Sequence, residues 1–143
     1  MREILFRGKR IDNGEWVKGY LVPITINCYD KGYEIIESDG IEYDELDGYN
    51  PLFSSFRVYP ETVGQYTGLN DVHGKQIFEG DIIHARCAED GSLTGGFVNF
   101  TNGCFCVCYF GNNPAIDLLK EYEVIGNIHD NPELIGGKED GQD

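Results

Sequence analysis

The sequence predicts an all-β fold, and three observations carry that prediction. Nineteen glycines against a single methionine suit many turns and short strands better than long helices. In short runs, apolar and polar residues alternate with a period of two, as they do on a strand with one buried face. Turn-forming residues, often glycine, separate these runs at short spacing, as in a small β-barrel or β-sandwich.

The composition is that of a folded protein rather than a disordered one. Hydrophobic residues make up 41% of the 143 positions and aromatic residues 13%, which is ample apolar surface for a core. The length suits one domain, or two small domains that share a core.

Residues 1–22 are predicted to form a β-hairpin. The segments EILFRGKRI and EWVKGYLV flank Asp12-Asn13-Gly14. An Asn-Gly pair readily adopts the positive φ angles of a tight hairpin turn, so this is a strong local signal. We therefore expect Gly14 to be a structural turn residue, with Trp16 and Tyr20 on one face of the second strand.

Residues 23–57 are predicted to be a variable excursion at the surface, so that the first domain spans 1–57. Eight of the eighteen residues from 30 to 47 are acidic and only Lys31 is basic. Like charges repel, which keeps such a backbone in solvent. The segment GYEIIES is compatible with one strand, and YNPLFSSF at 49–56 is predicted to be a loop with aromatic anchors.

Residues 58–135 are predicted to contain the remaining strands, followed by a disordered tail at 136–143. A hairpin is expected around Thr101-Asn102-Gly103, within GFVNFTNGCFCVCYF, and a last strand at YEVIGNI. The segment NPAIDLLKEY is compatible with one short helix. A single helical turn is expected in DNPELI, with Asn131 as its cap and Pro132 at its first position.

The stretch TGLNDVHGKQIFEGDII at 67–83 is interpreted as a series of bends. Gly68, Gly74 and Gly80 are predicted to lie where the chain reverses and a Cβ atom would clash. Asp81, directly after the last of these glycines, is predicted to accept backbone N–H groups of the turn. The stretch is not a phosphate-binding loop, because it lacks the Lys-Ser or Lys-Thr ending and a following helix.

The same stretch offers an alternative site built from Glu79, Asp81 and His84. Carboxylate oxygens and an imidazole are suitable metal ligands or acid–base groups. Strand alternation separates Asp81 from His84, however, since Asp81 would point with Ile83 and His84 would point the other way. Ile83, Ala85 and Cys87 are predicted to face the core. We therefore favour turn stabilisation, and predict no catalytic residues, no metal and no cofactor.

The row Cys104, Cys106 and Cys108 in CFCVCYF is predicted to be buried and reduced. Alternate positions on a strand are about 7 Å apart, too far for a disulfide between neighbours. Zinc sites more often use Cys-x-x-Cys pairs, and no second pair is present. Small apolar packing is the favoured role for these thiols.

Aromatic residues are common enough to form a peptide-binding face, although core packing together with ordinary surface tyrosines is the favoured interpretation. The residues considered for such a face are Trp16, Tyr20, Phe53, Phe56, Tyr59 and Tyr66.

The net charge of −14 predicts the class of partner. Affinity for nucleic acid comes largely from lysine and arginine, and only 11 basic residues face 25 acidic ones. We therefore predict no direct binding of nucleic acid, and expect a protein partner with a basic surface. From the charge alone, we favour the plainer interpretation that it only keeps the protein in solution.

The sequence gives no indication of a membrane protein. No apolar run approaches the roughly 20 residues that a membrane-spanning helix needs. The opening MREILFRGKR lacks the apolar core and cleavage site of a signal peptide. We expect a cytoplasmic protein, in which the five cysteines stay reduced.

Three motifs in matching order resemble the YopX family, small proteins of bacteriophages and prophages with undefined function. They are REILFRGKRIDNGEWVKGYL, YTGLNDVHGKQIFEGDII and YEVIGNIHDNPEL, and the likeness covers residues 2–22 and 60–135. The resemblance implies a small Src-homology-type β-barrel at 58–135 with the N-terminal β-hairpin attached. It also implies a phage-encoded protein in a bacterial cytoplasm, and it supplies no catalytic residues.

Our first functional hypothesis is a non-enzymatic interaction module with an acidic, tyrosine-rich surface. The predicted partner-binding residues are Asp39, Glu42, Tyr43, Asp44 and Glu45. A second hypothesis is a DNA-mimic inhibitor of a basic host protein, in which these carboxylates replace phosphates. A metal-dependent hydrolase is the third, and association of copies through exposed strand edges is a further option.

In the DNA-mimic hypothesis Glu121 and Glu123 would extend the acidic surface.

Overall fold

A computed structural model describes residues 3–44, 46, 48–87, 91–101, 103–108 and 119–136, with side chains omitted for 38–44, 48–53 and 136. The predicted all-β class is confirmed, because the described chain is nearly all strand. It forms two compact units, residues 1–65 and 66–143. The sequence-based division into 1–57, 58–135 and 136–143 stays a prediction.

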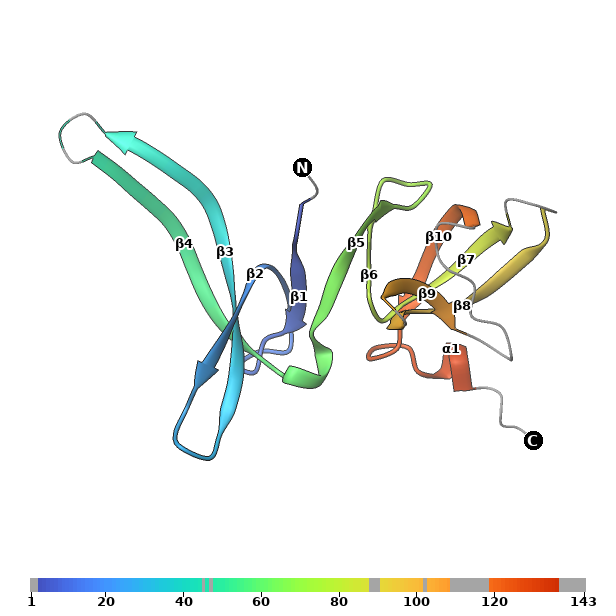
Figure 1. The fold of residues 1–143 in the computed structure, drawn as a ribbon, viewed down its shortest axis with the longest axis horizontal. Coiled ribbons are helices and arrows are strands. Elements are labelled where there is room, and N and C mark those ends of the chain that lie inside the picture. The colour runs from blue at the N-terminus through green and yellow to red at the C-terminus, as the bar shows by residue number, and fades with distance from the viewer. Residues whose placement is uncertain are drawn as a thin grey trace. The chain divides into compact units, whose positions relative to one another are not determined.

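Unit 1 is an antiparallel sheet in the order β4-β3-β2-β1 (Figure 1). The first two residues of the next strand, β5, pair with β1 at the other edge of the sheet. A short 3-10 helix, η1 (Pro60–Thr62), precedes β5. The strands are β1 (Phe6–Lys9), β2 (Trp16–Thr25), β3 (Lys31–Asp44), β4 (Gly48–Val58) and β5 (Gly64–Asn70).

The N-terminal hairpin predicted from the Asn-Gly pair is confirmed as β1–β2. Gly14 has a φ of 75°, and its N–H donates to the Arg10 carbonyl at 2.9 Å. The Asn13 side chain accepts the Glu15 N–H at 2.9 Å, which fixes the turn from the other side. Local turn chemistry therefore sets the register of this hairpin.

The loop expected at 49–56 is wrong, since these residues belong to β4, which forms a long regular hairpin with β3. The segment GYEIIES, considered as one strand, is part of β3. The variable excursion at 23–57 stays a prediction. Pairing runs from Tyr33 opposite Val58 to Asp44 opposite Gly48, with one register shift between Ser38 and Gly40. A two-stranded ribbon exposes both of its faces. Backbone pairing of β3 with β4 is therefore compatible with the acidic composition of this segment.

The core of unit 1 lies inside the curl of its sheet. Arg10 forms a bridge with Val58, and the Tyr59 N–H donates to the Lys9 carbonyl at 2.9 Å, so the end of β1 meets the end of β4. The sheet curls without closing into a barrel. Its buried residues are Val17, Ile35 and Val58, with Phe6, Leu21, Phe56 and Val63 packed around them.

Unit 2 contains an antiparallel sheet in the order β10-β7-β8-β9. Strand β6 pairs instead with β5, where Tyr66 lies opposite Phe78 and Asn70 opposite Gln76. The elements are β6 (Gln76–Phe78), β7 (Asp81–Cys87), β8 (Leu93–Thr101), β9 (Cys104–Cys108), β10 (Leu119–Asn127) and α1 (Glu133–Gly136).

The barrel expected at 58–135 is not closed, whereas the hairpin, the last strand and the helical turn expected there are confirmed. Within the described residues β9 pairs only with β8 and β10 only with β7, so the four-stranded sheet stays open. The β8–β9 hairpin turns at Gly103, with a φ of 82°. The helical turn after Pro132 is α1. Of the segment considered for a further helix, residues 113–118 lie outside the described residues and 119–122 are strand.

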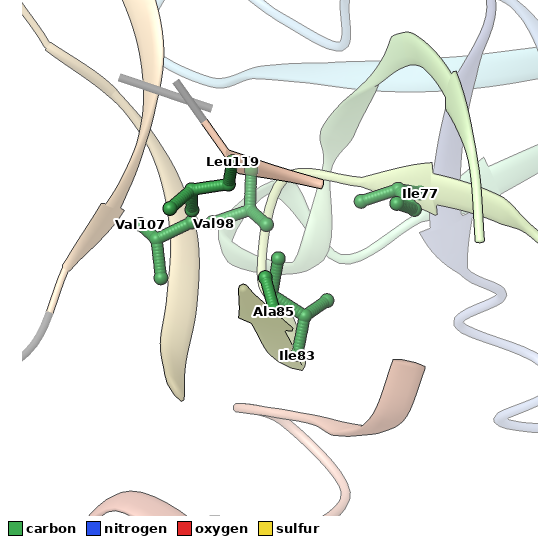
Figure 2. Packing of buried hydrophobic residues seen from close by; sticks show 6 residues of the cluster. All are labelled: Ile77, Ile83, Ala85, Val98, Val107 and Leu119. Carbon is green, nitrogen blue, oxygen red and sulfur yellow. The ribbon is translucent and has the colours of Figure 1, made fainter. Parts of the chain in front are cut away.

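The core of unit 2 gathers side chains from every strand of its sheet and from β6 (Figure 2). The prediction that Ile83 and Ala85 face the core is confirmed, since they are 0% and 1% exposed, and Cys87 packs against them. Burying one such aliphatic side chain contributes about 1.5–3 kcal/mol. The six buried residues are Ile77, Ile83, Ala85, Val98, Val107 and Leu119.

Candidate functional site

The turn between β5 and β6 is built on the carboxylate of Asp71. Its Oδ1 accepts the N–H groups of His73 at 2.8 Å and Lys75 at 2.9 Å. Its Oδ2 accepts the Val124 N–H at 3.1 Å, which ties the turn to β10. The Asp-x-x-Gly pattern ending at Gly74 is the local signal for this turn, whereas the contact with β10 is visible only in three dimensions.

Hydrogen bonding keeps Asp71 ionised despite its burial. The residue is only 8% exposed, and burial by itself raises the pKa of its carboxyl group. The three backbone N–H donors outweigh burial and hold the pKa below its ordinary value. Asp71 is therefore a charged residue whose two carboxylate oxygens both accept backbone hydrogen bonds and so hold the turn together.

The glycines of the 67–83 stretch adopt left-handed backbone conformations. Gly68, Gly74 and Gly80 have φ values of 88°, 83° and 89°. At Gly74 nothing lies within 4 Å of the position a Cβ atom would take, so the requirement there is conformational. At Gly80 the N–H donates to the Val98 carbonyl and the carbonyl accepts the Ile128 N–H, each at 2.8 Å.

Glu79, Asp81 and His84 do not converge on one point. The Asp81 side chain is 1% exposed, and its Oδ2 accepts the Phe78 N–H at 2.8 Å across the turn. His84 is exposed and Glu79 is half-buried. In the part of the chain that the structure describes, no three His, Cys, Asp or Glu residues are close enough to hold a metal ion. This arrangement stabilises a turn.

A shallow depression of about 340 Å³ lies on β7 and β8, lined by His84, Leu93, Thr94 and Gly95. Gly95 keeps it open, because a Cβ atom there would lie 2.9 Å from Cδ2 of His84. Leu93 is 70% exposed at its rim. Among the described residues, the buried Oγ1 of Thr94 has no hydrogen-bond partner.

Replacing Thr94 with valine is expected to raise the free energy of unfolding by about 1 kcal/mol, because a buried hydroxyl without a partner costs desolvation energy. Thr67 provides a matched control. Its buried Oγ1 donates to the Ile77 carbonyl at 2.8 Å and accepts the Leu69 N–H at 3.1 Å. Thr67→Val should lower the free energy of unfolding by about 1–3 kcal/mol. Urea denaturation measures both, and an equal loss in the two variants would show that Thr94 has a partner.

The β10 carboxylates considered as additions to an acidic surface each have a basic neighbour. Glu121 Oε1 lies 3.0 Å from Nε of Arg86, and Glu123 Oε2 lies 3.4 Å from Nε2 of His73. Both pairs are exposed, so solvent screens them and they contribute little to stability. Glu121 sits at a bulge of β10 with a φ of 56°. Its charge is locally compensated by Arg86, which weakens its suitability as a phosphate substitute.

The predicted partner-binding residues belong to a part of the β3–β4 hairpin that we call the acidic arm, residues 37–55. Strand β2 pairs with β3 only from Lys31 to Ile36, and beyond that point β3 and β4 pair with each other. Figure 1 shows the two strands continuing past β2 as a two-stranded ribbon. The arm contains six carboxylates and no lysine or arginine.

The register places four of the five predicted residues along β3 of the acidic arm. Glu42 lies opposite Asn50, Tyr43 opposite Tyr49, and Asp44 opposite Gly48, while Asp39 falls at the register shift. Glu45 lies outside the described residues, as do the side chains of the other four.

The aromatic candidates lie in different surroundings, some packed in a core and others exposed. Trp16 lies beneath two cations, with the Arg7 guanidinium 4.7 Å and the Lys9 ammonium 5.6 Å from its ring centre. Phe56 packs on the core of unit 1, with the Arg10 guanidinium 4.0 Å above it. Tyr66 is buried in unit 2 and donates a hydrogen bond to Asn70.

The remaining aromatic candidates are Tyr20 and Tyr59, which are exposed, and Phe53, whose side chain lies outside the described residues.

The cysteine row corrects two expectations. Only Cys106 is buried, whereas Cys108 is half-buried and Cys104 is exposed. The Sγ atoms of Cys104 and Cys106 lie 3.6 Å apart, although alternate strand positions were expected to keep them separate. The expectation took the backbone spacing as the spacing of the thiols, but both side chains lean toward the same carbonyl, that of Thr101.

No helix in the described ranges is both long and apolar enough to cross a membrane.

A search of curated proteins finds no match for the chain. Among solved structures, the chain is similar to the crystal structure of protein EF1440 from Enterococcus faecalis, with 24% identity and a TM-score of 0.61. The alignment covers 94% of this chain and 99% of that one, and at this identity it shows the fold alone.

A family model described as YopX protein matches residues 5–136. This range covers most of both units, the whole acidic arm and the turn built on Asp71. The motifs at 2–22 and 60–135 that resembled the family lie almost entirely within it. The chain therefore belongs to the YopX family.

Proposed function

We propose that this YopX-family chain is a non-enzymatic accessory protein that binds a basic protein surface through the acidic arm. The observation that carries the proposal is the arm itself: a paired ribbon that continues past β2 with six carboxylates and no basic residue (Figure 1). We further propose that the protein is encoded by a phage or prophage and acts in the bacterial host cytoplasm.

Electrostatics supports the arm as a docking element. Charges of one sign on a protruding segment steer an oppositely charged partner, and association can rise about 10-fold or more at low salt. Salt screens this attraction, because the Debye length is only about 8 Å at physiological ionic strength. Binding through the arm should therefore weaken steeply as salt rises.

The described residues of the 67–84 region support the non-enzymatic part of the proposal. Asp71 and Asp81 accept backbone N–H groups inside turns, and His84 stands apart from them in a shallow depression. The two aspartates have structural roles that explain their presence without a substrate. The chain would then use unit 2 as a scaffold.

Inhibition by DNA mimicry is a narrower form of this proposal, favoured by the absence of any lysine or arginine from the acidic arm. The basic surface that the arm occupies would then be the nucleic-acid site of its partner. Duplex DNA should compete with the chain for that partner, because both would neutralise the same basic residues.

The test uses an arm variant with four amides: Asp39→Asn, Glu42→Gln, Asp44→Asn and Glu45→Gln. A matched control replaces four exposed carboxylates outside the arm: Glu15→Gln, Glu61→Gln, Asp130→Asn and Glu133→Gln. In pull-downs from host lysate at low salt, we expect wild type and control to retain one partner and the arm variant to lose it.

High salt should release the partner from wild type. At low salt, the association rate of the partner with the arm variant should be lower than with wild type by about 10-fold or more. Recovery of no partner at either salt would contradict the proposal, as would equal retention by the arm variant. If duplex DNA displaces the chain from its partner, the result supports DNA mimicry. If duplex DNA does not displace it, the proposal is restricted to an interaction module.

A further inference from the structure

The two thiols of Cys104 and Cys106 are in contact at the start of β9. Their Sγ atoms lie 3.6 Å apart, on alternate positions that share one face of the strand. Both thiols lie within reach of the Thr101 carbonyl, at 3.5 Å and 3.9 Å. A disulfide bond is about 2.05 Å long, so its formation needs side-chain rotation together with a small adjustment of the backbone at the start of β9.

The pair combines an accessible sulfur with a protected one. Cys104 is exposed beside the β8–β9 turn, whereas Cys106 is 6% exposed. A dissolved oxidant therefore reaches Cys104 first, and Cys106 is already positioned to react with the product. Cys108, on the same face two residues further on, is half-buried and is a suitable control.

We propose that Cys104 and Cys106 form a reversible dithiol–disulfide couple that a peroxide oxidises. The Cys104 thiolate attacks one peroxide oxygen, the O–O bond breaks, and sulfenic acid and hydroxide form. The Cys106 thiolate then attacks the sulfenic sulfur, so that the S–S bond forms and a second hydroxide leaves. Each hydroxide takes up a thiol proton, so two thiols and hydrogen peroxide give one disulfide and two waters.

Strand geometry makes this disulfide easy to reduce. The Cα atoms of residues i and i+2 on a strand are about 6.6 Å apart, near the upper end of the range that a disulfide spans. A bond under such strain has a higher reduction potential than a structural disulfide, and exposure of Cys104 gives reducing thiols access. The couple can therefore be reset by an ordinary dithiol.

Metal binding is the competing use of two adjacent thiols. A structural zinc ion needs four ligands, and within the described residues no third His, Cys, Asp or Glu joins the pair. The geometry thus favours the redox couple.

The experiment treats reduced wild-type protein with one equivalent of hydrogen peroxide, alkylates the remaining thiols and maps the peptides by mass spectrometry. We expect the peptide with residues 104 and 106 to lose two hydrogen atoms and both alkylations, and dithiothreitol to restore both. Cys108→Ser should behave like wild type. Cys104→Ser should leave Cys106 fully open to alkylation after the same treatment, once the protein is denatured.

Three results would overturn the proposal. The first is alkylation of both cysteines after peroxide, and the second is oxidation of Cys104 to sulfinic acid with Cys106 unchanged. The third is a zinc ion, bound in the native mass spectrum of wild type, that is lost in both single variants and blocks disulfide formation.

Discussion

Replacing Gly19 with alanine is expected to lower the free energy of unfolding of unit 1 by about 3 kcal/mol or more. An added Cβ atom would lie 2.1 Å from the carbonyl oxygen of Ile36 and 2.8 Å from its carbon. These are backbone atoms of β3, so neither can rotate away as a side chain would. Strands β2 and β3 would have to separate at the base of the acidic arm.

Gly32, on β3 itself, provides the matched control. A Cβ atom there would meet only side-chain carbons, the nearest being Cδ1 of Ile26 at 3.4 Å. Gly32→Ala should leave stability unchanged or raise it by up to about 1 kcal/mol, because alanine restricts the unfolded chain. Urea denaturation followed by fluorescence of Trp16, the single tryptophan, reports on unit 1. Equal losses in both variants would contradict the packing described at Gly19.

Replacing Asp71 with asparagine is expected to lower the free energy of unfolding of unit 2 by about 2–3 kcal/mol at neutral pH. The amide keeps one acceptor oxygen for the turn, but its NH₂ group would face one of the backbone N–H donors that the carboxylate accepts. A charged acceptor is lost as well, and hydrogen bonds to charged groups are the stronger ones. Loss of hydrogen-exchange protection at Val124 N–H would identify the site of the damage.

The effect of Asp71→Asn should depend on pH in a defined direction. The pKa of Asp71 is lower in the folded protein than its ordinary value of 3.8. The carboxylate therefore contributes its full stabilisation above about pH 5, and that contribution is lost as the pH falls through the folded pKa. The difference between wild type and variant should shrink over this acid range.

Asp130→Asn, at an exposed carboxylate of unit 2, should show neither the loss nor the pH dependence. A difference between wild type and Asp71→Asn that stays constant down to pH 2 would show that the charge of Asp71 is not what the turn requires.

Where one short segment contains its own turn chemistry, the sequence was sufficient to predict the structure. The β1–β2 hairpin follows from Asn13-Gly14, and the β8–β9 hairpin from the Asn-Gly pair that ends at Gly103. Alternation on β7 correctly placed Ile83 and Ala85 in the core. These features depend only on residues near one another in the chain.

The features that sequence reasoning missed depend on distant partners or on side-chain direction. The acidic arm is regular because β4 pairs with β3 along its length, which outweighs the composition of its segment. The link from Asp71 to Val124 joins positions 53 residues apart. The contact between Cys104 and Cys106 depends on rotamers, which backbone periodicity does not specify.

Affinity for the purified partner tests the central claim, that the acidic arm binds and the 67–84 region is scaffold. Titrations at low salt should compare wild type, the four-amide arm variant and His84→Gln, which alters the exposed imidazole in the depression of unit 2. The account predicts a loss of about 10-fold or more for the arm variant and none for His84→Gln. Full affinity in the arm variant, together with a loss in His84→Gln, would contradict it.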